Sequence, residues 1–184
     1  MPKIVNHSVM RSELLMRSFE FFYHFGFQGT SMRDLSKKLK VSTGTLYHYF
    51  VDKEDLFEKM MMELSTQDID YGKSLLNSSG TSQNRWQKFS EFIEEKEDYF
   101  KMLLILLIDF QRNKNKSKNS NFHQILENYV LNIKTELNLS TDVKAEIFFN
   151  ALIGFLVRQL IIPSKSSKND LHEYIKALKS SLGE

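Results

Sequence analysis

Apolar residues recur at steps of three and four along most of this chain, which is the spacing of one face of an α-helix. Leu14, Phe22 and Phe25 lie on one such stripe, and Leu56 and Met60 begin another. The 184 residues include only two prolines and seven glycines, so few positions interrupt a helix or favour a β-turn. The pattern predicts an all-α fold of about nine helices.

Short polar or glycine-containing stretches separate the predicted helices, at residues 26–29, 77–82, 113–121, 138–141 and 163–169. Gly26 suits the left-handed residue that ends many helices, whereas Thr30 or Ser31, and then Ser42, suit helix N-caps. We therefore expect a short helix after the Thr30 or Ser31 cap, with Leu35 and Leu39 facing inward, and helices over residues 8–25, 42–50, 52–71, 83–96, 98–112, 122–137, 142–162 and 170–182.

The composition excludes several classes of protein. The chain has no cysteine, which rules out disulfides, thiolate metal sites and cysteine nucleophiles and favours a reducing, cytoplasmic setting. Its N-terminus lacks the apolar segment of a secretory signal. The longest apolar run, Met102–Ile108, is far shorter than the about 20 residues of a membrane span, so we expect no membrane association.

Positive charge is concentrated at the start of the chain. Residues 1–50 carry seven Lys or Arg and three acidic residues, a balance of +4, whereas the whole chain has a formal net charge of +2. A basic head on a slightly acidic body suggests that the head has a polyanion as its partner.

Residues 29–53 have the physical features of a helix-turn-helix, in which a short capped helix is followed by a tight turn and a second short helix. Leu46 and Phe50 lie four residues apart and can hold the second helix against a core. Small hydroxyl, glycine and aromatic side chains are left on its other faces, and they suit the major groove of DNA and its phosphates. Burial of Tyr47 and Tyr49 in the core is the alternative.

Within this stretch the sequence resembles a known family. The block of residues 26–56, G-F-x-G-T-S-M-R-D-L-x-x-K-L-x-V-S-x-G-T-L-Y-x-Y-F-x-x-K-E-x-L, is similar to the DNA-binding domain of TetR-family transcriptional regulators. The resemblance covers residues from about 10 to 60, and the chain length and the number of predicted helices also resemble that family. It implies a helix-turn-helix DNA-binding domain at residues 1–51 and a ligand-binding and dimerisation domain at residues 52–184.

The resemblance also implies roles for single residues. Thr30 and Ser42 would bind phosphate at helix N-termini, and Arg33 would reach a base edge, with guanine as the expected base. Lys40 departs from the family pattern, which commonly has glycine there, and a left-handed lysine would cost free energy unless it gains a phosphate contact. The expected DNA contacts are Thr30, Arg33, Ser42, Thr43, Gly44, Thr45, Tyr47, His48, Tyr49 and Lys53.

The segment from Ile147 to Ile162 is apolar almost all round, which is typical of a helix that is central or lies in a subunit interface. We expect the last two helices to pair with those of a second copy as a four-helix bundle, with some apolar side chains facing inward instead. An ordinary buried helix in a monomer is the alternative. The candidate interface residues are Phe148, Phe149, Leu152, Gly154, Phe155, Leu156, Leu171, Tyr174, Ile175 and Leu178.

Aromatic and Met side chains are frequent in the last two-thirds of the chain. Ordinary helix packing explains most of them, but TetR relatives carry ligand pockets in this region, which implies a cavity for an apolar small molecule. A ligand there would move the helix at residues 52–71, the only predicted segment that touches both regions in sequence. The candidate ligand-binding residues are Met61, Leu64, Trp86, Phe89, Phe100 and Leu103.

Taken together, these features predict a cytoplasmic, homodimeric repressor that binds an operator in double-stranded DNA and is released by an apolar small molecule. The sequence has no acid–base pair, glycine-rich phosphate loop or nucleophile elbow, so we expect no enzymatic activity, metal or cofactor. The alternative is a helical dimer that binds an apolar ligand or a protein partner without specific DNA binding. The intact set of Arg33, Thr45, Tyr47 and Lys53 favours the regulator.

Overall fold

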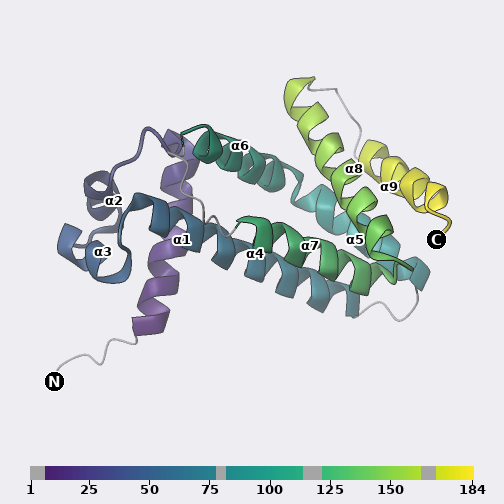
Figure 1. Ribbon diagram of the computed structural model, residues 1–184, viewed down its shortest axis with the longest axis horizontal. Helices are drawn as coiled ribbons and strands as arrows, with labels where there is room; N and C mark the ends of the chain where they lie inside the picture. Colours follow the sequence, from purple (N-terminus) through teal and green to yellow (C-terminus); the bar gives the residue numbers. More distant parts are fainter. Residues whose placement is uncertain (1–6, 78–81, 114–121, 163–168) are drawn as a thin grey trace. The chain divides into compact units, whose positions relative to one another are not determined.

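The computed structural model describes residues 7–77, 82–113, 122–162 and 169–184, and these residues form nine α-helices and no strand (Figure 1). The expected all-α fold is confirmed. Within the described ranges, none of the helices combines the length and the apolar character that crossing a membrane requires. The helices are α1 (His7–Phe25), α2 (Met32–Leu39), α3 (Thr43–Tyr49), α4 (Lys53–Asn77), α5 (Ser82–Glu95), α6 (Glu97–Asn113), α7 (Phe122–Leu137), α8 (Asp142–Ile161) and α9 (Asn169–Ser181).

Most helix ends agree with the sequence to within a few residues. Gly26 has a φ of 67° and ends α1 in the left-handed conformation, as expected. The predicted polar loops at 77–82, 113–121 and 163–169 fall almost wholly outside the described residues.

α4 differs most from its predicted range, because it continues to Asn77 rather than ending near Tyr71. Gly72 does not break the helix. It is buried, and a Cβ at this position would meet Phe92 Cε1 at 3.6 Å. A Cβ here would be at ordinary van der Waals distance from the Phe92 ring, so the packing does not require glycine, and the helix continues through Gly72 despite the low helix propensity of this residue.

The chain divides into two compact units. Unit 1 combines residues 1–66 with residues 105–122, and unit 2 combines residues 67–104 with residues 123–184. The division falls within α4 and within α6, and Phe122, the first residue of α7, also belongs to unit 1, so the helix that begins near residue 52 is not alone in belonging to both units. The functional boundary between residues 51 and 52 stays a prediction.

The core of unit 1 is an aromatic cluster of four buried residues, Phe22, Phe27, Phe57 and Phe110. The ring of Phe57 stacks on Phe110 with a centroid distance of 4.7 Å. Its contacts with Phe22 at 5.1 Å and Phe27 at 5.2 Å are edge-on. These residues come from α1, the α1–α2 loop, α4 and α6, so one cluster packs four segments together. It thereby holds in place the part of unit 1 from which α2 and α3 extend.

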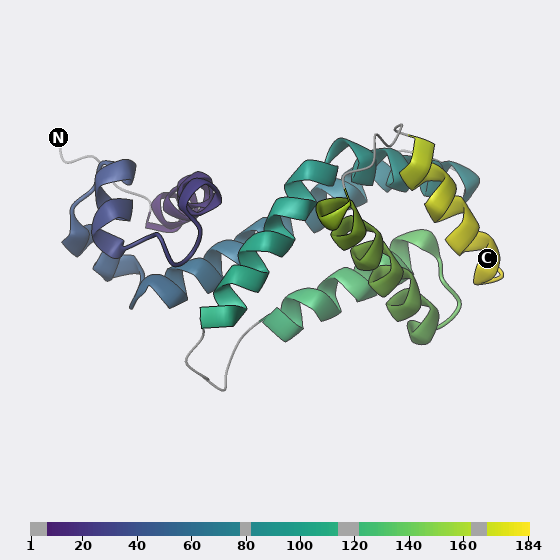
Figure 2. The ribbon, with the colours of Figure 1, turned by 90° about the horizontal axis from the view of Figure 1, so that it is seen from above.

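The core of unit 2 is built around Phe148 of α8, which is fully buried. Trp86 lies edge-on against its ring at 5.4 Å, and Phe89 is 5.7 Å away. α9 packs against both α5 and α8, and Figure 2 shows α8 and α9 side by side.

This packing corrects part of the predicted dimer surface. Six of the candidate interface residues are already buried within a single copy, so they offer a partner little surface: Phe148, Leu152, Phe155, Leu156, Leu171 and Ile175. Phe149, Tyr174 and Leu178 are half-buried, and Gly154 is exposed. The apolar residues of α8 therefore lie on two faces of the helix, one buried in the core of unit 2 and one exposed.

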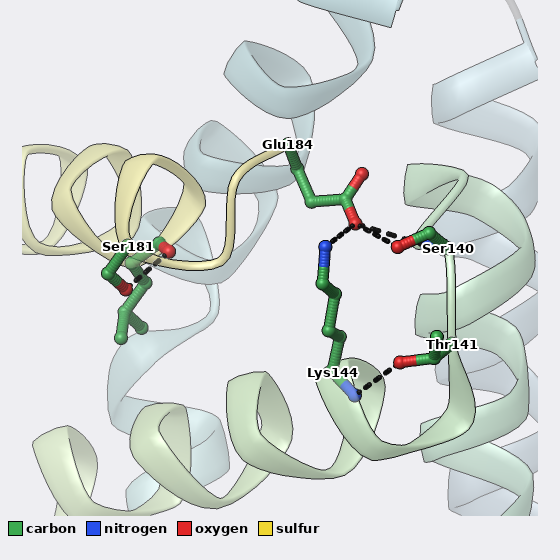
Figure 3. A network of polar contacts seen from close by, with 6 residues as sticks. Ser140, Thr141, Lys144, Ser181 and Glu184 are labelled. Carbon is green, nitrogen blue, oxygen red and sulfur yellow. Dashed lines mark hydrogen bonds and ion pairs between the residues drawn. The ribbon is translucent and has the colours of Figure 1, made fainter.

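A network of hydrogen bonds and an ion pair links Glu184 to the loop between α7 and α8 and to the first turn of α8 (Figure 3). Oε1 of Glu184 accepts hydrogen bonds from the hydroxyl of Ser140 at 2.8 Å and its backbone N–H at 3.1 Å, and it pairs with Lys144 Nζ at 2.9 Å. The bond from Lys144, with those from Ser140, lowers the pKa of Glu184 to about 2. Thr141 caps α8 by accepting from the Lys144 N–H.

Unit 2 also contains a buried carboxylate. Asp68 of α4 is 5% exposed, and its Oδ2 accepts from the hydroxyl of Tyr99 at 2.9 Å and that of Tyr129 at 3.0 Å. Burial raises the pKa of Asp68 to about 6, although the two tyrosine bonds and the nearby charge of Lys96 act in the opposite direction. The same burial and the negative charge of Asp68 raise the pKa of both tyrosines.

We predict that Asp68 makes stability depend on pH between about 7 and 4. Because the pKa is higher in the folded than in the unfolded state, protonation favours folding, and the free energy of unfolding gains on the order of 1–3 kcal/mol from this group as pH falls. Asp68→Asn keeps an acceptor for the tyrosines and should remove that dependence. It should be more stable than the native protein at pH 7 but not at pH 4.

Urea unfolding at a series of pH values tests this, with Asp70→Asn as the control, since Asp70 is an exposed residue of the same helix. Equal pH dependence in the native protein and Asp68→Asn would show that the carboxylate carries no such effect.

Candidate nucleic-acid interface

One side of the first turn of α2 faces solvent. Its N-cap is Ser31, whose Oγ accepts a hydrogen bond from the Asp34 N–H at 3.2 Å. Leu35 and Leu39 are buried on the opposite side, and this orientation leaves Arg33 exposed. The guanidinium expected to reach a base edge is therefore on an accessible surface.

Thr30 does not lie on that surface. It is 3% exposed, and its hydroxyl donates to the carbonyl of Gly26 at 2.7 Å. The side chain closes the turn after α1 instead of facing outward, which contradicts the expected phosphate contact. The cap of α2 is the next residue, Ser31.

The turn between α2 and α3 contains the lysine that departs from the family pattern. Lys40 has a φ of 57° and a ψ of 42°, so it adopts the left-handed conformation. Its N–H bonds to the carbonyls of Ser36 and Lys37, which satisfies the end of α2. The turn thus keeps the geometry that glycine would allow without steric cost, and the lysine accepts the strain.

The start of α3 is held by hydroxyl groups. Ser42 is the N-cap, and its Oγ accepts from the Thr45 N–H at 2.9 Å and lies 2.8 Å from Thr45 Oγ1. The hydroxyl of Thr43 lies 3.1 Å from that of Ser36 on α2. A hydroxyl has one donor and two acceptor positions, so these side chains keep further hydrogen-bonding capacity.

The two faces of α3 differ sharply. Leu46 is fully buried and Phe50, its C-cap residue, is 1% exposed. Gly44 and His48 are exposed, and Tyr47 is 55% exposed. The aromatic residue Tyr47 is thus on the surface rather than in the core, as a base-reading helix requires.

Tyr49 is half-buried and lies against the first turn of α1. Its hydroxyl is 3.0 Å from Nδ1 of His7. The contact of His7 with Tyr49 has no signal in the sequence, because no local pattern shows that residues 42 positions apart meet.

Lys53, the last expected DNA contact, is bound within unit 1. Its Nζ donates to the carbonyl of Phe27 at 2.9 Å and lies 4.1 Å from the centre of the Phe27 ring. The backbone N–H of Phe27 donates to Asp109 of α6 at 2.8 Å. Lys53 therefore helps to hold the α1–α2 loop in place, and its ammonium is already engaged by Phe27.

The candidate ligand-binding residues are divided between the units. Met61 and Leu64 belong to unit 1, whereas Trp86, Phe89, Phe100 and Leu103 belong to unit 2. All but Phe100 are buried, and Trp86 and Phe89 pack on Phe148. This assignment stays a prediction.

Across the described parts of the chain, no three acidic or histidine side chains gather as a metal ion would need.

Comparison with known proteins agrees with this geometry. Residues 14–60 match the family model of bacterial regulatory proteins of the tetR family. The HTH-type transcriptional regulator BetI of Escherichia coli is 29% identical over 89 residues, which are 47% of this chain and 46% of that protein. The chain thus spans about half the length of the curated relatives it matches.

Solved structures share the fold of the whole chain. A TetR-family transcriptional regulator from Mesorhizobium loti superposes with a TM-score of 0.73 at 19% identity, covering 97% of both chains. A transcriptional regulator from Pseudomonas aeruginosa gives a TM-score of 0.79 at 15% identity, covering 97% of this chain and 92% of the other. At these identities the similarity is one of fold.

The sequence of residues 14–60 is that of bacterial regulatory proteins of the tetR family, and the helical fold is shared with solved structures of TetR-family transcriptional regulators. Residues 14–60 therefore carry the family's DNA-binding sequence.

The left-handed lysine makes a prediction about stability. Lys40→Gly should raise the free energy of unfolding by about 1 kcal/mol, because glycine has no Cβ to clash in this conformation. Lys38→Gly, which makes the same exchange inside α2, should instead lower it by about 1 kcal/mol. Urea unfolding of the two variants measures both effects, and a loss of stability in Lys40→Gly would contradict the steric argument.

Proposed function

We propose that this protein is a homodimeric repressor that binds an operator in double-stranded DNA, with α3 as the recognition helix. The observation that carries the proposal is the exposed face of α3, where Gly44, Tyr47 and His48 face solvent above the buried Leu46 and Phe50. Arg33 is exposed on the preceding helix. Two such heads would read successive major grooves about 34–36 Å apart.

Charge supports DNA as the partner. Arg33, Lys37, Lys38 and Lys40 are all exposed on α2 and the turn after it, whereas Asp34 is half-buried in the cap of α2. A cationic surface beside a helix with exposed hydroxyl and aromatic groups suits a duplex, because phosphates attract the lysines while α3 reaches the bases. We place the protein in the cytoplasm, together with the DNA that it would bind.

Arg33 tests sequence-specific binding. Operators can be selected from a randomised duplex library, and Arg33→Ala should then weaken operator binding by about 1–3 kcal/mol and relax the preference at one base pair. Arg112→Ala, which removes an exposed arginine from α6, should leave both unchanged. No enrichment of any duplex by the native protein would favour a helical dimer that binds an apolar ligand or a protein without specific DNA binding.

An exposed apolar stripe on α8 supports the homodimer. Val143 is 62% exposed, Ile147 49% and Ile161 73%, and they lie at helical spacing on one side of the helix with Gly154. A Cβ on Gly154 would meet no atom within 4 Å. We propose that this stripe, with the half-buried Phe149, Tyr174 and Leu178, packs on its symmetry mate, where Gly154 allows the two helices to approach closely.

The open position of Gly154 makes the dimer testable. Gly154→Arg should fold normally, because the space is open and arginine is a better helix former than glycine, but it should be a monomer at micromolar concentration. Asn128→Arg adds the same charge at an exposed position of α7 and should stay dimeric. Light scattering distinguishes the two, and a native protein that is monomeric would remove this part of the proposal.

We also propose that an apolar small molecule releases the protein from DNA. The support is the aromatic and aliphatic character of unit 2 around Trp86, Phe89 and Phe100, where burial is almost wholly apolar. Ligand and DNA would oppose each other reciprocally, typically by 1–3 kcal/mol. Titration of apolar compounds into the DNA-bound protein tests this, and binding that leaves the DNA affinity unchanged would rule out the switch for that compound.

A further inference from the structure

A groove opens in unit 1 between the first turns of α1, the last turn of α3 and the third turn of α4. Its volume is about 670 Å³. None of the α1 residues in it belongs to the DNA contacts expected from the sequence. The groove is lined by His7, Ser8, Arg11 and Ser12 of α1, by His48 and Tyr49 of α3, and by Glu63 of α4.

Aromatic and polar contacts join α1 to the recognition helix along this groove. The His7 ring centroid is 5.8 Å from that of His48 and 6.0 Å from that of Tyr49, and the latter two are 5.1 Å apart. With the hydrogen bond between His7 and the Tyr49 hydroxyl at 3.0 Å, these contacts hold the start of α1 beside the end of α3. The exposed His48 belongs both to the groove and to the face of α3 that we assign to DNA.

Several groups in the groove can bind an anion. Arg11 contributes a permanent positive charge, and Ser8 contributes a hydroxyl donor. When the Tyr49 hydroxyl donates to His7 Nδ1, the neutral imidazole carries its proton on Nε2, which is then a donor as well. The carboxylate in the lining, Glu63, accepts a hydrogen bond from Ser12 at 2.6 Å.

We propose that this groove binds a backbone phosphate of the duplex next to the base pairs that α3 reads, so that the first turns of α1 form a second DNA-contacting element. The inference rests on the proposed DNA-binding function and extends it. A phosphate held by Arg11, Ser8 and His7 would fix the position of α3 along the DNA. Phosphate contacts orient a protein on the duplex, whereas base contacts specify the sequence.

The salt dependence of binding tests the protein side. Arg11→Gln should weaken operator binding about tenfold and reduce the slope of log K against log salt by about one per protomer. Arg11→Lys keeps the charge and should keep the slope. Lys176→Gln removes the same charge from an exposed position of α9 and should change neither quantity. Thermal unfolding of each variant verifies that it is folded.

Neutral methylphosphonate links, introduced one at a time along the operator, test the DNA side. One link flanking each half-site should weaken the native protein but have no further effect on Arg11→Gln. An unchanged salt slope in Arg11→Gln, or additive losses at every link, would overturn the assignment of the groove while leaving DNA binding intact. A native protein that binds no duplex would instead overturn the proposed function itself.

Discussion

The helix-turn-helix of this protein depends on how one loop residue, Phe27, is held. Its backbone N–H donates to Asp109 of α6, its carbonyl accepts from Lys53 at the start of α4, and its ring is 2% exposed in the aromatic cluster of unit 1. The ammonium of Lys53 also lies over that ring. Phe27 lies in the loop that joins α1 to α2. Because α4 and α6 hold this residue in place, they also fix the direction in which the chain continues into α2 and then into α3. A phenylalanine whose backbone and side chain are both engaged leaves the loop few alternatives.

This arrangement changes which residues are available to DNA. Lys53 and Thr30 are used within the head, the first to hold Phe27 and the second to close the turn after α1. The exposed surface that remains combines Arg33 with the outer face of α3 and, through the contacts between His7, His48 and Tyr49, continues onto α1. The proposed DNA-binding surface therefore comprises three elements, α2, α3 and the start of α1. Lys40 adopts the strained left-handed conformation in the turn between α2 and α3, and this turn sets the orientation of the two helices.

Unit 2 uses its apolar residues for two purposes. Phe148 and five other candidate interface residues form the core of a single copy, while Val143, Ile147 and Ile161 on the other side of α8 face outward. A helix that is apolar all round therefore joins an internal core to a surface that a second copy can cover. The hydrogen bonds from Tyr99 and Tyr129 to Asp68 add a polar link among α4, α6 and α7 in a region otherwise held by apolar contacts, and burial of that carboxylate makes its charge costly near neutral pH.

The sequence by itself determined the features that are local. The helices and their caps at Gly26, Ser31 and Ser42 follow from contacts within a few residues, and the strain at Lys40 follows from a glycine position that lysine occupies. The exposed α3 face follows from the four-residue spacing of Leu46 and Phe50. The tertiary structure alone decided what depends on partners distant in sequence. Asp109 meets Phe27 across 82 residues and Tyr129 meets Asp68 across 61, and helical periodicity contains no information about such pairs. For the same reason the burial of Thr30, the engagement of Lys53, the end of α4 beyond Gly72 and the division of α8 into core and surface became visible only in the folded chain, because each is set by which helix packs on which.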